Sequence, residues 1–326
     1  MTNYRQIVGE LTLSTWALSA LCASMEAGIV RELRQVSSPE GIASDIGIPL
    51  PIVESLLDVL RALGLARREG AGFVADAELA AIPNWESATL SAAMHSALLQ
   101  GAQTVQRARS RTLTSGWTYS DPELLQAQGT FSTGVVPAWT TQVIPTLEGL
   151  KNELQKPGAA FLDVGTGVAS IAIAMCRHFP DLQVVGIDPH EPALVEGRKN
   201  VEKAGLANRI DLRRIGVEAM QEESTFTLAN LPVLFLPTDV LQSGLRAVFT
   251  ALRPGGWLIA QVPPTSGDTL APSLFRLACA LCGSRPLSPE EVKLMLHRTG
   301  YIQTAILPPL SGPFVRYVVA RRPEPQ

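Results

Sequence analysis

Charge and cysteine are both scarce in this sequence. Only 17% of its 326 residues are charged, and 27 Lys and Arg against 30 Asp and Glu leave a formal net charge of −3. Without a basic excess the chain is poorly suited to neutralising a phosphate backbone, so we expect no nucleic-acid partner. Four cysteines are far too few for a disulfide-stapled secreted domain, and no basic run of the kind that opens a secretion signal begins the chain. We therefore expect a cytoplasmic protein with reduced thiols.

Long apolar runs are also few. The best candidate for a membrane span is residues 11–30, which are mostly apolar and long enough. Polar groups interrupt this segment at Thr12, Ser14, Thr15, Ser19, Ser24 and Glu26. Because such groups suit a protein environment better than lipid, we predict a packed or interface helix here and no membrane partner.

The apolar content of 46% is sufficient for two ordinary cores in a chain of this length. Residues 1–85 are predicted to form a helical module. Within it Ser38 can cap a helix over 39–46, a second helix follows over 50–63, and 65–75 form two short strands around a glycine turn. This order of helix, turn, helix and hairpin predicts a winged helix.

A winged helix raises the possibility of DNA binding. The helix that would enter the groove offers Glu54 and Asp58 but only one cation, Arg61. Because base and phosphate recognition needs donors and positive charge, we favour an interaction or dimerisation module.

Beyond the first module the pattern changes twice. Residues 86–157 are predicted to form a helical cap or linker. Residues 158–326 alternate strands with amphipathic helices, which predicts an α/β, Rossmann-like, doubly wound and mostly parallel sheet. The last two strands, over 302–307 and 316–320, are expected to close one edge of this sheet as an antiparallel hairpin.

The strongest local signal is a glycine loop between a strand and a helix. Gly165, Thr166 and Gly167 follow the strand over 160–164, so the backbone can turn tightly and approach a ligand. In a dinucleotide-binding loop a third glycine would stand at Ser170. Its absence disfavours a pyrophosphate ligand, although an NAD-binding domain stays an alternative.

Two carboxylates accompany the glycine loop. Asp163 precedes it, disfavours a phosphate and can instead anchor a positively charged ammonium group, directly or through water. Asp188 ends the next strand, where it can accept hydrogen bonds from both hydroxyls of a ribose. Pro189 and His190 follow directly and are expected near the ribose or adenine. A ligand with an amino-acid end and a nucleoside end fits both carboxylates.

The loop 162–167, Asp188 and the turn 252–257 together resemble the class I S-adenosylmethionine-dependent methyltransferases, in particular small-molecule O-methyltransferases with an amino-terminal winged-helix module. The resemblance implies S-adenosylmethionine as cofactor, a small-molecule acceptor of the secondary-metabolite kind, and a homodimer. Where the family often has Gly-Asp after the third strand, with the Asp near the adenine amine, this chain has Val217 and Glu218. The adenine contact is therefore expected from Glu218 or from backbone carbonyls.

The catalytic group departs from the family more clearly. Small-molecule O-methyltransferases of this shape commonly carry a His after the fourth strand, where this chain has Asn230. An amide can orient a reacting group but cannot act as a general base. We predict this orienting role for Asn230, which also counts among the cofactor contacts, and take His95 in the cap region as a second catalytic candidate.

Aromatic residues of the cap are the remaining candidates for the acceptor pocket, where a sulfonium is attracted to aromatic faces. They are Trp117, Tyr119, Phe131 and Trp139. No metal is expected, because the single pair Cys279 and Cys282 lacks a second pair or a nearby His.

The missing base leaves two uses of the cofactor open. Methyl transfer needs an acceptor aligned with the methyl group, and is our first prediction. The alternative is intramolecular cyclisation, in which the cofactor's own amine attacks its γ-carbon, giving azetidine-2-carboxylate and methylthioadenosine. A DNA-binding regulator that responds to S-adenosylmethionine is a third, weaker alternative.

Overall fold

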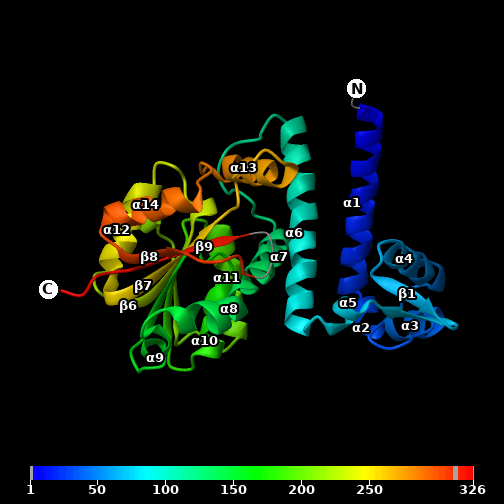
Figure 1. Cartoon of the computed structure of the whole chain (residues 1–326), viewed down its shortest axis with the longest axis horizontal. Helices are drawn as coiled ribbons and strands as arrows, with labels where there is room; N and C mark the ends of the chain where they lie inside the picture. Colours follow the sequence, from blue (N-terminus) through cyan, green and yellow to red (C-terminus); the bar gives the residue numbers. More distant parts are fainter. Residues whose placement is uncertain (1–2, 311–314, 326) are drawn as a thin grey trace. The chain divides into compact units, whose positions relative to one another are not determined.

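The computed structural model describes residues 3–310 and 315–325, which form two compact units, Met1–Gln106 and Arg107–Gln326 (Figure 1). This differs from the predicted division into 1–85, 86–157 and 158–326. The helix α6 runs unbroken from Asn84 to Arg109, so no boundary falls at 85. The chain that follows α6 packs within the same unit as the sheet, because its helices cover apolar side chains of the sheet.

The first unit is helical apart from one hairpin. Its elements before α6 are α1 (Tyr4–Glu26), α2 (Ile29–Glu32), α3 (Pro39–Ile46), α4 (Leu50–Ala62), β1 (Ala66–Glu69), β2 (Gly72–Ala75) and α5 (Ala77–Ala81). The Ser38 side chain accepts a hydrogen bond from Gly41 N and so caps α3. β1 and β2 pair antiparallel. The two predicted helices and the hairpin after them are thus confirmed.

The helix α1 is the one helix within residues 3–310 and 315–325 that is long and apolar enough to cross a membrane, by length and composition alone. Its buried residues, Cys22 and Ser24, lie near its carboxyl end. Trp16 on the first half is 73% exposed. Packing within this chain therefore accounts for the last turns of α1 and not for its apolar first half.

The second unit contains a seven-stranded sheet in the order β5-β4-β3-β6-β7-β9-β8. The strands are β3 (Ala160–Val164), β4 (Gln183–Ile187), β5 (Ile210–Arg213), β6 (Phe226–Pro232), β7 (Leu252–Val262), β8 (Ile302–Ile306) and β9 (Arg316–Arg321). β3 to β7 are parallel, whereas β9 pairs antiparallel with β7 and with β8. The predicted mostly parallel sheet with an antiparallel edge is confirmed.

Helices cover both faces of this sheet. The remaining helices of the unit are α7 (Pro122–Thr133), α8 (Val135–Ala138), the π-helix η1 (Trp139–Val143), the 3₁₀ turn η2 (Ile144–Thr146), α9 (Leu150–Leu154), α10 (Ser170–His178), α11 (Glu191–Lys203), the 3₁₀ turns η3 (Val217–Ala219) and η4 (Val233–Phe235), α12 (Leu241–Ala251), α13 (Leu270–Cys282) and α14 (Pro289–Thr299). Neighbouring residues of one strand point to opposite faces of the sheet and therefore belong to different hydrophobic clusters. Phe161 joins the cluster beneath α8, α9 and α10, and Leu162 joins the cluster beneath α12 and α14. Burial on both faces explains why the strands are apolar almost throughout.

Candidate active site

The glycine loop turns at the carboxyl end of β3. Gly165 and Gly167 have φ values of +65° and +55°. A residue with a side chain would be strained in this left-handed conformation. The N–H groups of Gly165 and Thr166 donate to the carbonyl of Ile187 at 2.8 and 3.1 Å. The loop is therefore fastened to the end of β4 and leads directly into α10.

Asp188 connects this loop to the start of α11. Its Oδ2 accepts a hydrogen bond from Gly167 N at 2.9 Å, and its Oδ1 accepts one from His190 N at 2.8 Å. Burial raises the pKa of the Asp188 carboxyl above its usual range, although the hydrogen bonds from His190 and Gly167 act in the opposite direction. The carboxylate is thus fixed beside the cavity.

Asp163 does not make the direct ligand contact that the sequence left open, and a contact through water stays a prediction. It is 1% exposed and does not line the cavity. Its Oδ1 accepts from Asn230 Nδ2 and its Oδ2 accepts from Thr166 Oγ1, both at 2.9 Å. Direct contact with a ligand's ammonium group is therefore not available in this structure, because β3 ends one residue later and turns this side chain under the loop. Asp163 instead positions Thr166 and Asn230, which do line the cavity.

Desolvation decides the acidity of Asp163. Burial raises its pKa to about 6, the hydrogen bonds from Asn230 and Thr166 lower it, and the nearby charge of Asp188 raises it further. The buried surroundings of Asp163 therefore disfavour its ionised form, which brings its pKa close to neutral pH.

Asn230 stands at the end of β6, directly across from Asp163 in the strand register. While its amide nitrogen donates to Asp163, its Oδ1 accepts a hydrogen bond from Gln261 Nε2 at 2.8 Å. Gln261 lies on β7 and also lines the cavity. Our sequence reasoning missed Gln261, although a polar residue inside the apolar run 257–262 at the carboxyl end of a strand was a usable signal.

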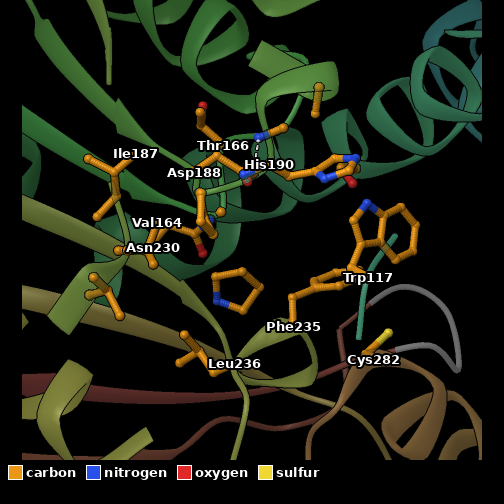
Figure 2. Close-up of a pocket in the computed structure, with 18 of the residues that line it drawn as sticks. Trp117, Val164, Thr166, Ile187, Asp188, His190, Asn230, Phe235, Leu236 and Cys282 are labelled. Atoms are coloured by element: carbon orange, nitrogen blue, oxygen red, sulfur yellow. Dashed lines mark hydrogen bonds between the residues drawn. The ribbon is translucent and has the colours of Figure 1, made fainter. Parts of the chain in front are cut away.

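One cavity of about 430 Å³ brings these groups together (Figure 2). Nine of the predicted cofactor residues line it: Gly165, Thr166, Gly167, Asp188, Pro189, His190, Val217, Glu218 and Asn230. Its volume lies within the range of roughly 300–1,000 Å³ that is typical of small-molecule sites. Figure 2 shows Thr166, Asp188 and His190 on one side of the cavity and Phe235, Leu236 and Cys282 on another.

Only one of the four predicted pocket aromatics lines the cavity. Trp117 does so, with its ring edge-on to Tyr119 at 4.9 Å and to Phe235 at 5.1 Å between centroids. Tyr119 is buried behind it, where the Arg107 guanidinium lies 4.5 Å from the ring centroid. The carbonyl of Tyr119 also forms a 2.7 Å hydrogen bond with His190 Nε2, which ties the Trp117 loop to the end of β4.

Two aromatic predictions are corrected. Trp139 is fully buried in the core beneath α8 and α10, edge-on to Tyr317, because the π-helical turn η1 points it at the sheet. Phe131 does not line the cavity either. His95 lies on α6 within the unit Met1–Gln106, and its catalytic role stays a prediction.

The wall formed by Trp117, Phe235, Leu236 and Cys282 is apolar, and its only titratable side chain is a thiol. Burial, together with the charge of Cys279, raises the pKa of Cys282 to about 12, so this thiol is neutral near pH 7. Among the described residues no group of three or more His, Cys, Asp or Glu side chains is placed to hold a metal ion.

Residues 161–256 match a methyltransferase domain family. Among curated proteins, a demethylmenaquinone methyltransferase of Bacteroides fragilis is 25% identical over 139 residues, which cover 42% of this chain and 54% of the relative. A release factor glutamine methyltransferase of Gloeobacter violaceus is 40% identical over 145 residues, covering 36% and 51%. The chain thus spans about half the length of the curated relatives it matches.

Solved structures match over nearly the whole chain. Mitomycin 7-O-methyltransferase MmcR has a TM-score of 0.65 at 20% identity, covering 98% of both chains. An O-methyltransferase family protein from Burkholderia thailandensis has a TM-score of 0.66 at 14% identity, covering 100% of both. Human N-acetylserotonin methyltransferase in complex with S-adenosylmethionine has a TM-score of 0.65 at 13% identity, covering 99% of both. At such identities these matches establish the fold.

Proposed function

We propose that this chain, which has the class I S-adenosylmethionine-dependent methyltransferase fold and a methyltransferase domain over residues 161–256, transfers the methyl group of S-adenosylmethionine to a small molecule. The observation that carries the proposal is the Asp188 carboxylate, held by Gly167 N and His190 N beside the glycine loop, in one cavity with an apolar wall. A nucleoside end and a small apolar acceptor can share this cavity.

The order of the strands supports a proposal for which part of the ligand each lining residue would meet. Val217 and Glu218 follow β5 and would meet the adenine, and Asp188 on β4 would accept hydrogen bonds from the ribose hydroxyls. The loop after β3 would hold the methionine portion. Asn230 on β6 comes next along the sheet edge and would lie beside the reacting carbon.

S-adenosylmethionine supplies an electrophilic methyl group on a positively charged sulfur. The residues of this chain would align an acceptor with that carbon at about 3 Å and exclude water from the site. The apolar wall with Trp117 and Phe235 suits both tasks, since it is dry and would place an aromatic face near the sulfonium. This apolar wall offers no general base, so an acceptor that reacts while lying against it would be a nucleophile that needs little help in losing its proton.

A second candidate is the intramolecular cyclisation of S-adenosylmethionine. In this reaction the neutral amine forms a bond to the γ-carbon, the bond from that carbon to sulfur breaks, and methylthioadenosine leaves. The placement of Asp163 favours it, because a carboxylate buried behind Thr166 and Asn230 is not available to hold the amine in its ammonium form.

Product analysis separates the two reactions. Purified protein is incubated with S-adenosylmethionine, with and without a panel of small aromatic acceptors, and the products are followed by mass spectrometry. Methyl transfer gives S-adenosylhomocysteine only when an acceptor is present. Methylthioadenosine and a four-carbon imino acid from S-adenosylmethionine alone would instead establish cyclisation. The Asp188→Ala variant is the control and should be less active in either case, because it binds S-adenosylmethionine more weakly.

The helix α1 supports a homodimer. The exposed apolar side chains of its first half are Tyr4, Ile7, Val8, Leu11, Leu13 and Trp16. An apolar face of this kind is stabilised when a second copy covers it, with residues 1–85 serving as a winged-helix dimerisation module and not as a DNA-binding domain. Light scattering after size-exclusion chromatography should give a dimer for the native chain and a smaller species for Trp16→Glu.

The remaining parts of the proposal are the compartment and the acceptor class. All four cysteines are free and buried, which is compatible with a reducing cytoplasm. The apolar cavity wall, and the likeness in fold to mitomycin 7-O-methyltransferase, support an acceptor of the secondary-metabolite kind. The low positive charge supports the absence of a nucleic-acid partner.

A further inference from the structure

Four polar side chains form one continuous chain of hydrogen bonds across the carboxyl end of the sheet. Thr166 Oγ1 and Asn230 Nδ2 both donate to the Asp163 carboxylate at 2.9 Å, and Gln261 Nε2 donates to Asn230 Oδ1 at 2.8 Å. The residues come from the loop after β3 and from the strands β3, β6 and β7, which are neighbours in the sheet. This series of hydrogen bonds begins under the glycine loop and ends in the cavity.

The Asp163 carboxylate decides which group donates and which accepts in each of these hydrogen bonds. An ionised carboxylate can only accept hydrogen bonds, so Asn230 must turn its NH₂ group toward Asp163 and its oxygen toward Gln261. Gln261 must then donate its NH₂ group to that oxygen. The orientation of the two amides therefore follows from the chemistry of the carboxylate.

The series of hydrogen bonds ends at Gln261, whose Oε1 atom is free to accept a further hydrogen bond. The Gln261 side chain is half-buried and lines the cavity, and its Oε1 has no hydrogen-bond partner among residues 3–310 and 315–325. Gln261 lies opposite Pro232 in the strand register, on the far side of Asn230 from Asp188. The segment that follows Pro232 supplies the apolar side chains Phe235 and Leu236 to the same cavity.

We propose that Gln261 determines substrate specificity: its Oε1 accepts a hydrogen bond from an N–H or O–H group of the acceptor molecule. The acceptor class is then a small, largely apolar molecule, with aromatic amines, indoles and phenols as examples, that carries a neutral hydrogen-bond donor. A molecule of the same shape without the donor leaves Oε1 buried and unpaired, and such a loss is discriminated strongly in an otherwise apolar site. This inference rests on the proposed function, because it places the acceptor beyond Asn230.

The test measures binding, so it needs no knowledge of the natural acceptor. The protein is first saturated with S-adenosylhomocysteine, whose binding is itself measured by calorimetry. Two matched pairs of probes are then titrated: 2-naphthol against 2-methoxynaphthalene, and indole against 1-methylindole. We expect the member with a donor to bind at least about fivefold more tightly, from the net value of one hydrogen bond.

Three variants locate the origin of this preference. Gln261→Met keeps the length of the side chain but removes the acceptor oxygen, and should reduce the ratio within each pair to about one. Asp163→Asn should weaken the preference from outside the cavity, because an amide at position 163 can also donate and no longer forces Asn230 into one orientation. Gln183→Met, on the exposed first residue of β4, is the matched control and should keep the native ratio.

The outcomes are distinguishable. An unchanged ratio in Gln261→Met, equal binding of both members by the native protein, or binding of neither would overturn the assignment of Gln261. If S-adenosylhomocysteine itself does not bind, the proposed function fails and the role of Gln261 fails with it. A retained affinity for S-adenosylhomocysteine with no preference for donors refutes the role of Gln261 alone.

Discussion

Replacing Asp163 with asparagine should change how the stability of this protein depends on pH. Asp163 is 1% exposed, and burial raises the pKa of its carboxyl from 3.8 to about 6. The asparagine side chain has nearly the same shape: its one oxygen can still accept one of the two hydrogen bonds, and its NH₂ group can donate to the Thr166 hydroxyl in place of the other. The substitution therefore removes the titration of this site while it keeps most of the packing.

The raised pKa of Asp163 decides whether its contribution to stability is lost as pH rises or as pH falls. A carboxyl group with a raised pKa in the folded state binds its proton more tightly there than in the unfolded chain. Its contribution to stability is fully present below about pH 4 and is lost as pH rises through about 6, where the folded protein must bury a charge. A shift of about two pKa units corresponds to roughly 3 kcal/mol, since one unit is worth about 1.4 kcal/mol.

The assay is unfolding by denaturant at several pH values between about 4 and 8, for the native protein and for Asp163→Asn. Because the two compact units need not unfold together, the transition of the sheet unit is followed by a tryptophan signal in the background of the Trp16→Phe and Trp85→Phe substitutions. The quantity compared is the difference in unfolding free energy between the two proteins. Asp181→Asn, at an exposed acid beside β4, controls for a general change in charge.

From pH 4 to pH 8 the native protein should lose roughly 2–3 kcal/mol of stability relative to Asp163→Asn, since part of the loss has already occurred at pH 4. A difference that stays flat across this range would show that Asp163 is not desolvated as the structure places it. A difference of the opposite slope would mean that the hydrogen bonds from Asn230 and Thr166 outweigh burial, and would refute the reasoning.

Three further predictions concern binding, turnover and packing. Asp188→Ala should weaken S-adenosylmethionine binding by roughly 1–3 kcal/mol in calorimetry, because charge-assisted hydrogen bonds to the ribose are lost, and an unchanged affinity would mean that the nucleoside lies elsewhere. Asn230→Ala should lower kcat more than it raises KM for S-adenosylmethionine, and a change confined to KM would reduce Asn230 to a binding contact. Gly129→Ala should destabilise the protein by about 1–3 kcal/mol in thermal unfolding, because a Cβ at this position meets the Val168 side chain, and an unchanged melting temperature would show that α7 can shift freely.

The fold was largely predictable because it follows from patterns among residues that are close together in the sequence. Alternating short apolar runs and amphipathic helices required a parallel sheet covered on both faces, and β3 to β7 with their helices have this arrangement. The boundary near residue 85 was wrong. Composition changes there, whereas the helix α6 continues through it, because helix continuity depends on backbone hydrogen bonds that composition does not reveal.

By itself the sequence determined the glycine loop, the position of Asp188 and the lack of a histidine after β6, since each depends on residues close together in the chain. Only the tertiary structure decided what Asp163 and Trp139 contact and that Gln261 reaches the cavity. The physical reason is that a side chain at the end of a strand points either into the site or beneath it. Which of the two occurs is set by the neighbouring strands, whose residues lie far away in the sequence.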